Sequence, residues 1–239
     1  MITHATAQRI GTRSHQCDAT STATDRGTRA WTLLDGIGST TAVRNWTRTQ
    51  ARLLARVGAL TANPCAALAA VRAAVDHQDP QARRDLESFD EPSAVAVVAV
   101  RAEGGPLRVA WCGDARAYWL APGKDLRRLT RDHNEAERAR AEGRSAPRWH
   151  RNIVTSHLGR HPETGAFGEL GTAPPVRGAG RLLLCSDGVY SPFEDHDRDM
   201  SALLARGTPR AAATALVTTA VTLPDERHDN ATALIVDFA

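Results

Sequence analysis

The chain has 239 residues, 42% of them hydrophobic, which suffices for one large domain or two small ones with a buried core. Its net charge is only +3, and its basic residues, all Arg except Lys124, are scattered among acidic ones, which argues against nucleic-acid binding. It has no run of eighteen apolar residues and no secretory-signal pattern at the N-terminus, so we expect a cytoplasmic protein that does not enter a membrane.

The first half of the chain predicts a strand, two helices and then more strands. Residues 29–35 are typical of a strand, and residues 39–60 carry apolar side chains at helical spacing. A second helix is expected at residues 64–76, with Asn63 as its N-cap and Pro64 in its first turn. Three strands separated by glycine-containing turns should follow as an antiparallel meander. They are residues 93–102, 107–112 and 115–120.

The second half begins with a highly charged segment and then returns to regular elements. Residues 135–142 predict a short solvated helix, and a flexible exit follows it. Further strands are expected at 169–176, 181–186 and 231–238, and helices at 199–205 and 209–223. Two strand groups and two helix pairs predict a layered α+β fold. No repeat or low-complexity linker divides the chain, so residues 1–239 are interpreted as a single domain.

Four short segments each carry an acidic residue at the boundary of an apolar run. The residues are Asp35, Asp114, Asp187 and Asp229. A carboxylate at the end of a buried strand emerges where the sheet meets solvent, so the four could converge on one rim. Clustered carboxylates repel each other, and oxygen ligands suit hard divalent ions such as Mg²⁺ or Mn²⁺. The sequence therefore predicts a metal centre held by carboxylates.

The four cysteines, by contrast, do not predict a metal site. They contain no Cys-x-x-Cys pair and no zinc-type spacing with His. Cys112 and Cys185 lie in apolar strand patterns, so they are interpreted as small buried side chains.

Six segments occur in an order that resembles one family, the metal-dependent protein phosphatases of type 2C. They are Arg13 to Ala19, Leu34 to Gly38, Cys112 to Tyr118, Leu129 to Asn134, Leu184 to Gly188 and Asp229 to Thr232. The resemblance covers nearly the whole chain. It implies a four-layer αββα sandwich, in which two packed antiparallel sheets carry helix pairs on their outer faces. It also implies hydrolysis of phosphoserine and phosphothreonine.

The resemblance assigns a role to each acidic residue. Asp35 resembles the carboxylate that bridges two catalytic Mn²⁺ or Mg²⁺ ions, and the Gly36 carbonyl resembles a further ligand. Asp187 and Asp229 resemble the terminal ligands of the first ion. A water that bridges two such ions becomes a hydroxide near neutral pH and can attack phosphorus directly, so no protein nucleophile is needed.

Three more residues complete the implied site. Arg13 matches the arginine that grips the substrate phosphate, for which a planar guanidinium is suited. Asp114 resembles the ligand of a third, weaker ion in bacterial members, with a plain hairpin-turn residue as the alternative. Asp18 matches a family acid near the metals and is expected as an outer-shell partner.

Three positions depart from the family pattern or need a separate interpretation. Cys17 stands where relatives have Glu or Gln, so it is either a neighbour of the second metal, a redox-active thiol or a small packed residue. Ile37 replaces a histidine that protonates the leaving group in many eukaryotic relatives, and an apolar side chain cannot do this. His133 could replace that histidine, but a structural, hydrogen-bonded role is favoured.

Residues 133–158 correspond to the flap beside the family's active site. Phosphatases of partner-switching pathways tend to lack this insertion, so a general phosphatase that opposes serine/threonine kinases is favoured, acting as a monomer on phosphorylated proteins. Two alternatives remain open: a partner-switching phosphatase for one small phosphoprotein, and a catalytically weak domain that binds phosphoprotein.

Overall fold

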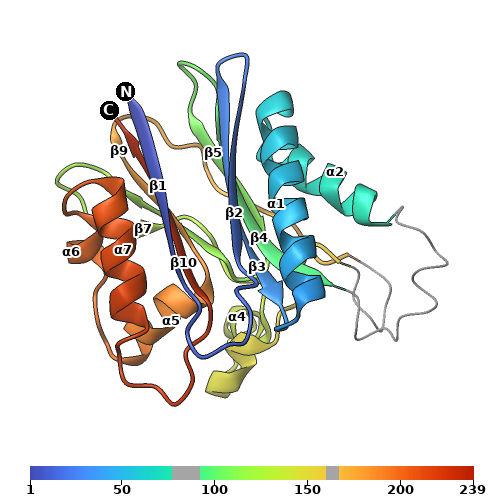
Figure 1. Cartoon of the computed structure of the whole chain (residues 1–239), viewed down its shortest axis with the longest axis vertical. Helices are drawn as coiled ribbons and strands as arrows, with labels where there is room; N and C mark the ends of the chain where they lie inside the picture. Colours follow the sequence, from blue (N-terminus) through green and yellow to red (C-terminus); the bar gives the residue numbers. More distant parts are fainter. Residues whose placement is uncertain (77–91, 160–166) are drawn as a thin grey trace.

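Two five-stranded antiparallel sheets lie face to face in the computed structural model, which describes residues 1–76, 92–159 and 167–239 (Figure 1). Sheet A has the strand order β1-β10-β9-β6-β7, with bounds Ile2–Arg9, Ala231–Phe238, Gly180–Cys185, Arg116–Leu120 and Arg127–Arg128. Sheet B has the order β2-β3-β4-β5-β8, with bounds Ala19–Asp25, Thr28–Ile37, Ser93–Arg101, Leu107–Cys112 and Gly171–Thr172.

Helices cover the outer face of each sheet, as Figure 1 shows. Helices α1 (Thr41–Thr61) and α2 (Pro64–Asp76) pack on sheet B, while α5 (Asp187–Asp195), α6 (Ser201–Leu204) and α7 (Pro209–Ala220) lie on the side of sheet A. Helix α4 (Glu135–Ala141) and the short 3₁₀ helix η1 (Arg148–Asn152) lie at the lower end of the sandwich in Figure 1. This arrangement confirms the predicted four-layer αββα fold.

The central strands are buried on both faces, and their side chains alternate between two cores. Along β4, Val95, Val97 and Ala99 point into the core between the sheets. The intervening side chains, such as Ala96 and Val98, join the core beneath α1 and α2. The same alternation divides β9 and β10 between the central core and a third core beneath α5 to α7. Three continuous apolar layers therefore support the site.

The predicted meander is wrong at its second turn. Strand β5 pairs with β4 in sheet B, but β6 pairs with β7 and β9 in sheet A. Gly113 makes this corner with φ +92°, and an added Cβ would lie 2.2 Å from a Val95 methyl group. Periodicity in the sequence identifies strands but does not say which sheet each joins.

The predicted strand at 169–176 is also shorter than expected. Only β8 and an isolated bridge between Leu107 and Val176 form there. Pro174 and Pro175 lie between them, and proline cannot donate a hydrogen bond to a neighbouring strand. Strands β1 and β2 were missed because they are polar, threonine-rich edge strands.

The two helices that follow β3 agree closely with the sequence pattern. Helix α2 occupies the predicted residues 64–76, and the Asn63 side chain caps it by accepting from the Cys65 and Ala66 amides at 3.0 and 3.2 Å. Helix α1 begins two residues later than predicted, capped by Thr40. No helix in the described ranges is long and apolar enough to cross a membrane.

Candidate metal centre and active site

The predicted acidic residues come from five separate segments and meet at one end of the sandwich. Asp35 lies in β3, Asp18 directly precedes β2, and Asp229 precedes β10 by two residues. Asp187 is the first residue of α5, and Asp114 lies at the corner between β5 and β6. All four of the others act electrostatically on Asp35. The structure therefore brings the whole predicted set together.

These carboxylates disfavour one another's charge. Burial raises the pKa of Asp35 well above its ordinary value, and the charges of Asp18 and Asp187 raise it further. Burial and the charge of Asp229 raise the pKa of Asp187 to about 6. The pKa of Asp114 is also raised well above its ordinary value, by burial and then by Asp187. A multivalent cation would relieve this repulsion.

Asp18 is the most enclosed of the set, with an exposed fraction of 2%. Its Oδ2 accepts from Ser186 Oγ at 2.8 Å, while the buried Oδ1 has no hydrogen-bond partner among the described residues. Burial raises the pKa of Asp18 to about 7, although hydrogen bonds from Thr232 and Ser186 oppose the shift. An unsatisfied buried carboxylate oxygen is costly, so a positive partner would stabilise it.

The donor chemistry fits a divalent metal ion. All the candidate ligands offer oxygen, which Mg²⁺ and Mn²⁺ prefer, and the mutual repulsion and the unsatisfied Asp18 Oδ1 both call for positive charge. However, no three His, Cys, Asp or Glu side chains within the described ranges are already arranged to hold one ion. The fit therefore rests on the charge and chemistry of the donors.

Arg13 extends from the β1–β2 loop to this cluster. Its Nη2 donates to Asp229 Oδ2 at 2.6 Å, with side-chain exposures of 47% and 39% for the two residues. Asp229 Oδ1 accepts from the Asn230 amide at 2.7 Å. Arg13 is the predicted residue that lies nearest to solvent, at the edge of the cluster.

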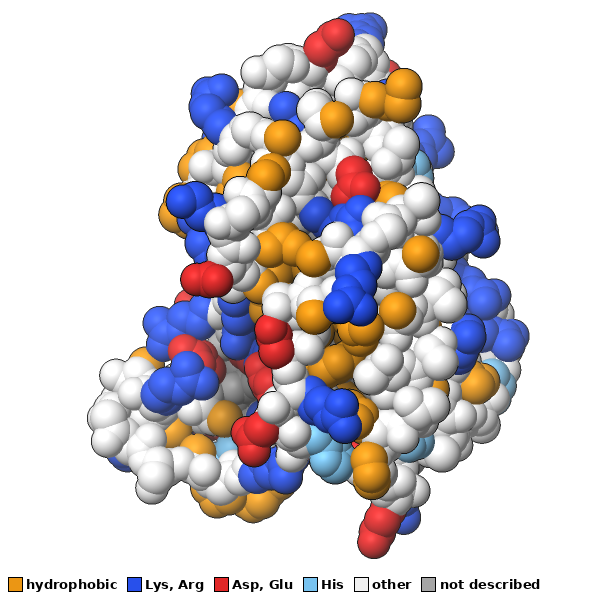
Figure 2. Space-filling model, turned by 90° about the vertical axis from the view of Figure 1, so that its left-hand side faces the viewer, with side chains coloured by type: hydrophobic (Ala, Val, Ile, Leu, Met, Phe, Trp, Pro, Cys, Tyr) orange, Lys and Arg blue, Asp and Glu red, His pale blue; other side chains and the backbone are white. Residues whose placement is uncertain are grey.

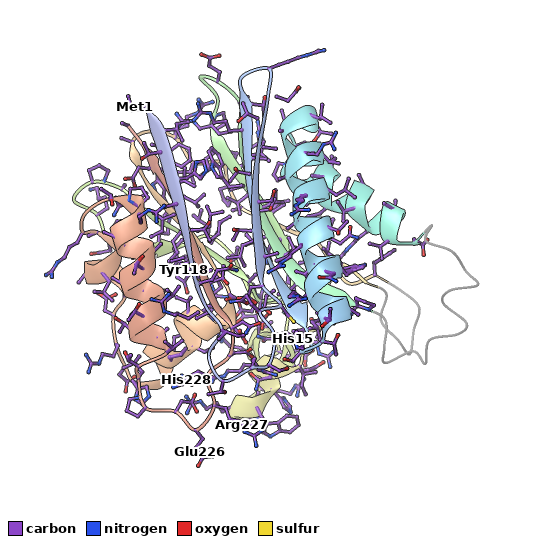
Figure 3. All side chains as sticks on the ribbon, viewed as in Figure 1. Met1, His15, Tyr118, Glu226, Arg227 and His228 are labelled. Carbon is purple, nitrogen blue, oxygen red and sulfur yellow. The ribbon has the colours of Figure 1, made fainter. Side chains whose placement is uncertain are left out.

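A cavity of about 650 Å³ opens beside Asp187 and Asp229. Its walls come from the β1–β2 loop, α5, η1 and the loop 225–229. His15 of the first loop and Glu226, Arg227 and His228 of the last lie at the same end of the molecule (Figure 3). Figure 2 shows acidic and basic side chains around a hollow low on the adjoining face. The cavity is thus polar, charged and open to solvent.

The predicted flap forms one wall of this cavity through η1. Arg151 Nη2 binds Asp195 Oδ2 at 2.6 Å, and Arg148 forms a second ion pair with the same carboxylate. Asp195 ends α5, the helix that begins with Asp187. Two arginines of the flap are therefore fixed to the helix that presents a candidate metal ligand.

Comparison with known proteins agrees with this geometry. Residues 21–155, more than half of the chain, match the family model of protein phosphatase 2C. The chain belongs to the protein phosphatase 2C family. It is therefore a metal-dependent protein-serine/threonine phosphatase, as the resemblance predicted. A search of the curated proteins gives no match.

Solved structures of bacterial phosphatases share the protein phosphatase 2C fold of this chain. PppA of Pseudomonas aeruginosa, described as a key regulatory component of T6SS, is 24% identical with a TM-score of 0.75, covering 99% of this chain and 98% of its own. The Mycobacterium tuberculosis phosphatase PstP is 24% identical with a TM-score of 0.73, covering 99% and 98%. Stp1 of Staphylococcus aureus is 18% identical with a TM-score of 0.80, covering 100% and 96%. The catalytic domain of PstP has also been solved with two manganese ions.

The positions that depart from the protein phosphatase 2C pattern have clear environments. Cys17 is 1% exposed, and its Sγ donates to Thr40 O at 3.7 Å. Burial raises the pKa of the Cys17 thiol, which disfavours a reactive thiolate. Ile37 is 44% exposed at the end of β3. Of the three interpretations of Cys17, the small packed residue agrees best with this enclosure.

His133 is held as a structural residue would be. Its ring stacks on Trp111 with centroids 5.8 Å apart, and its Nδ1 accepts from the Gly113 amide at 3.3 Å. Its backbone bonds to Gly113 and Thr155 join the β5–β6 corner to the end of the flap. These contacts agree with the favoured structural interpretation.

Sequence reasoning missed the polar residues that hold the site from behind. Ser186 bonds Asp18, and its Oγ also accepts from the Thr232 amide at 3.0 Å. Asn230 bonds two backbone groups of the β1–β2 loop. Both residues adjoin a candidate ligand in the sequence, and that adjacency was the available signal. Asp195 and its flap arginines lie too far apart in the sequence for any local pattern to reveal them.

Proposed function

We propose that this phosphatase hydrolyses phosphoserine and phosphothreonine in proteins, using two divalent ions, Mn²⁺ or Mg²⁺. Asp35 would hold both ions, with the Gly36 carbonyl as a further ligand, and Asp187 and Asp229 would complete the first. When bound, such a pair lowers the pKa of a water and supplies the hydroxide that attacks phosphorus. The observation that carries the proposal is the convergence of mutually repelling carboxylates, Asp18 and Asp114 buried and the other three half-buried, beside a cavity of about 650 Å³.

Arg13 would bind the substrate phosphate. Its guanidinium already lies at Asp229, at the mouth of the cavity, and it is half exposed. A guanidinium can donate two parallel hydrogen bonds to phosphate oxygens, which orients the phosphorus toward the candidate metal ligands. Substrate phosphate would thus be held between Arg13 and the carboxylate cluster.

Two further acids are proposed in supporting roles. Asp114 is 6% exposed at the corner between the sheets, so it is more enclosed than an ordinary hairpin residue, and it would serve a third, weaker ion. Asp18 would act from the outer shell, through its Oδ1. Because Ile37 has no proton to give, the leaving alkoxide would take its proton from water.

We propose a general phosphoprotein phosphatase rather than a dedicated partner-switching enzyme. Support comes from the flap, residues 133–158, which forms α4 and η1 and is fixed to α5 by two arginines. We also propose that the chain forms one catalytic domain that acts as a monomer in the cytoplasm.

The direct test is hydrolysis of p-nitrophenyl phosphate and of a phosphothreonine peptide with added Mn²⁺ or Mg²⁺. Activity that appears with metal and disappears with chelator supports the proposal. Activity toward only one phosphoprotein, with indifference to generic peptides, would favour the partner-switching alternative. A rate equal to that of buffer across both metal titrations would favour the phosphoprotein-binding domain.

A further inference from the structure

The side chain of Asn230 joins the two ends of the loop that carries Arg13. Asn230 is 4% exposed, and its Oδ1 accepts from the Cys17 amide at 2.6 Å. Its Nδ2 donates to Ile10 O at 2.9 Å. Arg13 lies between these two anchor points in the sequence. One buried amide group therefore closes the loop.

The backbone around Asn230 holds the same loop from the other side. The Thr12 amide and Oγ1 donate to His228 O at 2.9 and 3.1 Å. Gly11 has φ +63°, and an added Cβ would lie 2.4 Å from both His228 O and Asp229 O. The loop thus lies directly against residues 228–230.

This contact determines where Arg13 and Asp229 meet. The backbone amide of Asn230 donates to Asp229 Oδ1 at 2.7 Å, and Arg13 Nη2 donates to Asp229 Oδ2 at 2.6 Å. Asp229 is the ion-pair partner of Arg13 among the described residues. Since the Arg13 side chain is nearly half exposed, the position of its guanidinium depends on the backbone of the loop.

We propose that Asn230 is a positioning residue for Arg13: its buried amide fixes the loop from Ile10 to Cys17 so that the guanidinium faces the substrate phosphate. The inference rests on the proposed function, in which Arg13 binds that phosphate. Only a side chain with one acceptor and one donor satisfies both anchors. Aspartate keeps the acceptor for Cys17 but sets an oxygen against Ile10 O, while an apolar residue satisfies neither.

The test is the affinity for inorganic phosphate, measured by calorimetry on the Mn²⁺-loaded protein. Loss of one hydrogen bond and displacement of the loop in Asn230→Asp should weaken phosphate binding about tenfold. Mn²⁺ binding, measured in the same way, should not weaken. Asn63→Asp is the matched control, because Asn63 caps α2 far from the loop and its acceptor role survives the change. Its phosphate affinity should equal that of the wild type.

A double-mutant cycle with Arg13→Ala separates positioning from general damage. If Asn230 acts through Arg13, the double variant should bind phosphate no more weakly than Arg13→Ala alone. Additive losses would overturn the inference, as would unchanged affinity in Asn230→Asp alongside a loss in Arg13→Ala. If Arg13→Ala itself binds phosphate normally, the assignment of Arg13 in the proposed function fails as well, so the two failures are distinguishable.

Thr12→Val provides a variant that keeps the buried amide, in case Asn230→Asp does not fold. It removes the exposed bond from Thr12 Oγ1 to His228 O and should weaken phosphate binding about twofold, in the lower range for one hydrogen bond. Wild-type affinity in Thr12→Val, with Asn230→Asp unfolded, would overturn the inference.

Discussion

Two groups of charged residues lie close together in this molecule, and only one of them is neutralised by side chains of the chain itself. In the first, Asp132 accepts hydrogen bonds from Arg116 Nε at 3.1 Å and Arg116 Nη2 at 2.8 Å, and it also forms an ion pair with Arg128. In the second, burial and the charges of neighbouring carboxylates raise the pKa values of Asp18, Asp35, Asp114 and Asp187, and Asp18 Oδ1 has no partner among the described residues.

The depth of burial does not explain this difference. Asp132 is 8% exposed, against 2% for Asp18 and 6% for Asp114, while Asp35 and Asp187 are half-buried. What differs is the source of positive charge: the Asp132 group contains its own arginines, and the guanidinium of Arg116 also covers the Tyr190 ring at 3.4 Å. On the proposed function, an acid matched by arginines within the chain would serve stability, whereas the acids that repel each other would serve an external cation.

The largest effect should come from neutralising a candidate ligand. Asp187→Asn should lower metal-dependent hydrolysis about a hundredfold or more, because an amide oxygen binds a divalent cation more weakly than a carboxylate. Its melting temperature without metal should stay level or rise, since one repelling charge is gone. Elemental analysis should show less bound Mn²⁺ than in the wild type, and equal stoichiometry would contradict the ligand assignment.

The corresponding change in the matched group should act on stability instead. Asp132→Ala leaves Arg116 buried without its bidentate partner, which should cost about 3–5 kcal/mol of unfolding free energy. Urea denaturation measures this cost. Mn²⁺ stoichiometry of the folded protein should be unchanged, and a loss of bound metal here would erase the distinction between the two groups.

A substitution at Cys17 tests whether a charged side chain is tolerated at this packed position behind the site. Cys17→Glu places a larger carboxylate at a 1% exposed position and should cost about 3 kcal/mol, the upper range for an unsatisfied buried polar group. The Mn²⁺ concentration for half-maximal activity should not change. A lower metal requirement with an unchanged melting temperature would instead place this position beside the second ion.

The smallest effect should come from His133. Burial lowers the pKa of His133 in the folded protein below its value in the unfolded chain, so the unfolded chain binds more protons as the pH falls. The free energy of unfolding should therefore decrease as the pH drops below about 6.5. Glu169, 3.7 Å from its Nε2, partly offsets the shift, while Arg72 and Arg131 reinforce it and Asp132 opposes it. His133→Gln should remove this pH-dependent loss of stability. The measurement is the free energy of unfolding of both proteins from pH 7 to pH 5, and the difference between the two curves is the contribution of His133. Parallel curves would show that His133 titrates alike in both states.

The sequence predicted the fold best where burial is continuous. Strands β4 and β10 and helix α2 were found almost to the residue, because apolar runs and a capping Asn63 are local signals. It failed at the corner of Gly113, where one chain segment passes between sheets, and at the threonine-rich edge strands. A local sequence pattern does not determine which sheet a strand joins or which strand pairs with an edge strand.

For the site, the order of motifs predicted which acids would meet, and the structure brings them together. It did not predict the residues that hold them, because Ser186, Asn230 and Asp195 act through contacts across the fold. Those contacts depend on three-dimensional packing that spacing in the chain does not encode.

The central claim is that the repelling carboxylates form a divalent-metal centre. Its most direct test is the melting temperature of the wild type, Asp187→Asn and Asp132→Asn across a Mn²⁺ titration. An ion that binds only the folded state stabilises it by about 2.7 kcal/mol at a hundred times its Kd. We predict that Mn²⁺ raises the melting temperature of the wild type and of Asp132→Asn, and raises that of Asp187→Asn much less. An equal rise in all three proteins, or none in the wild type, would contradict the claim.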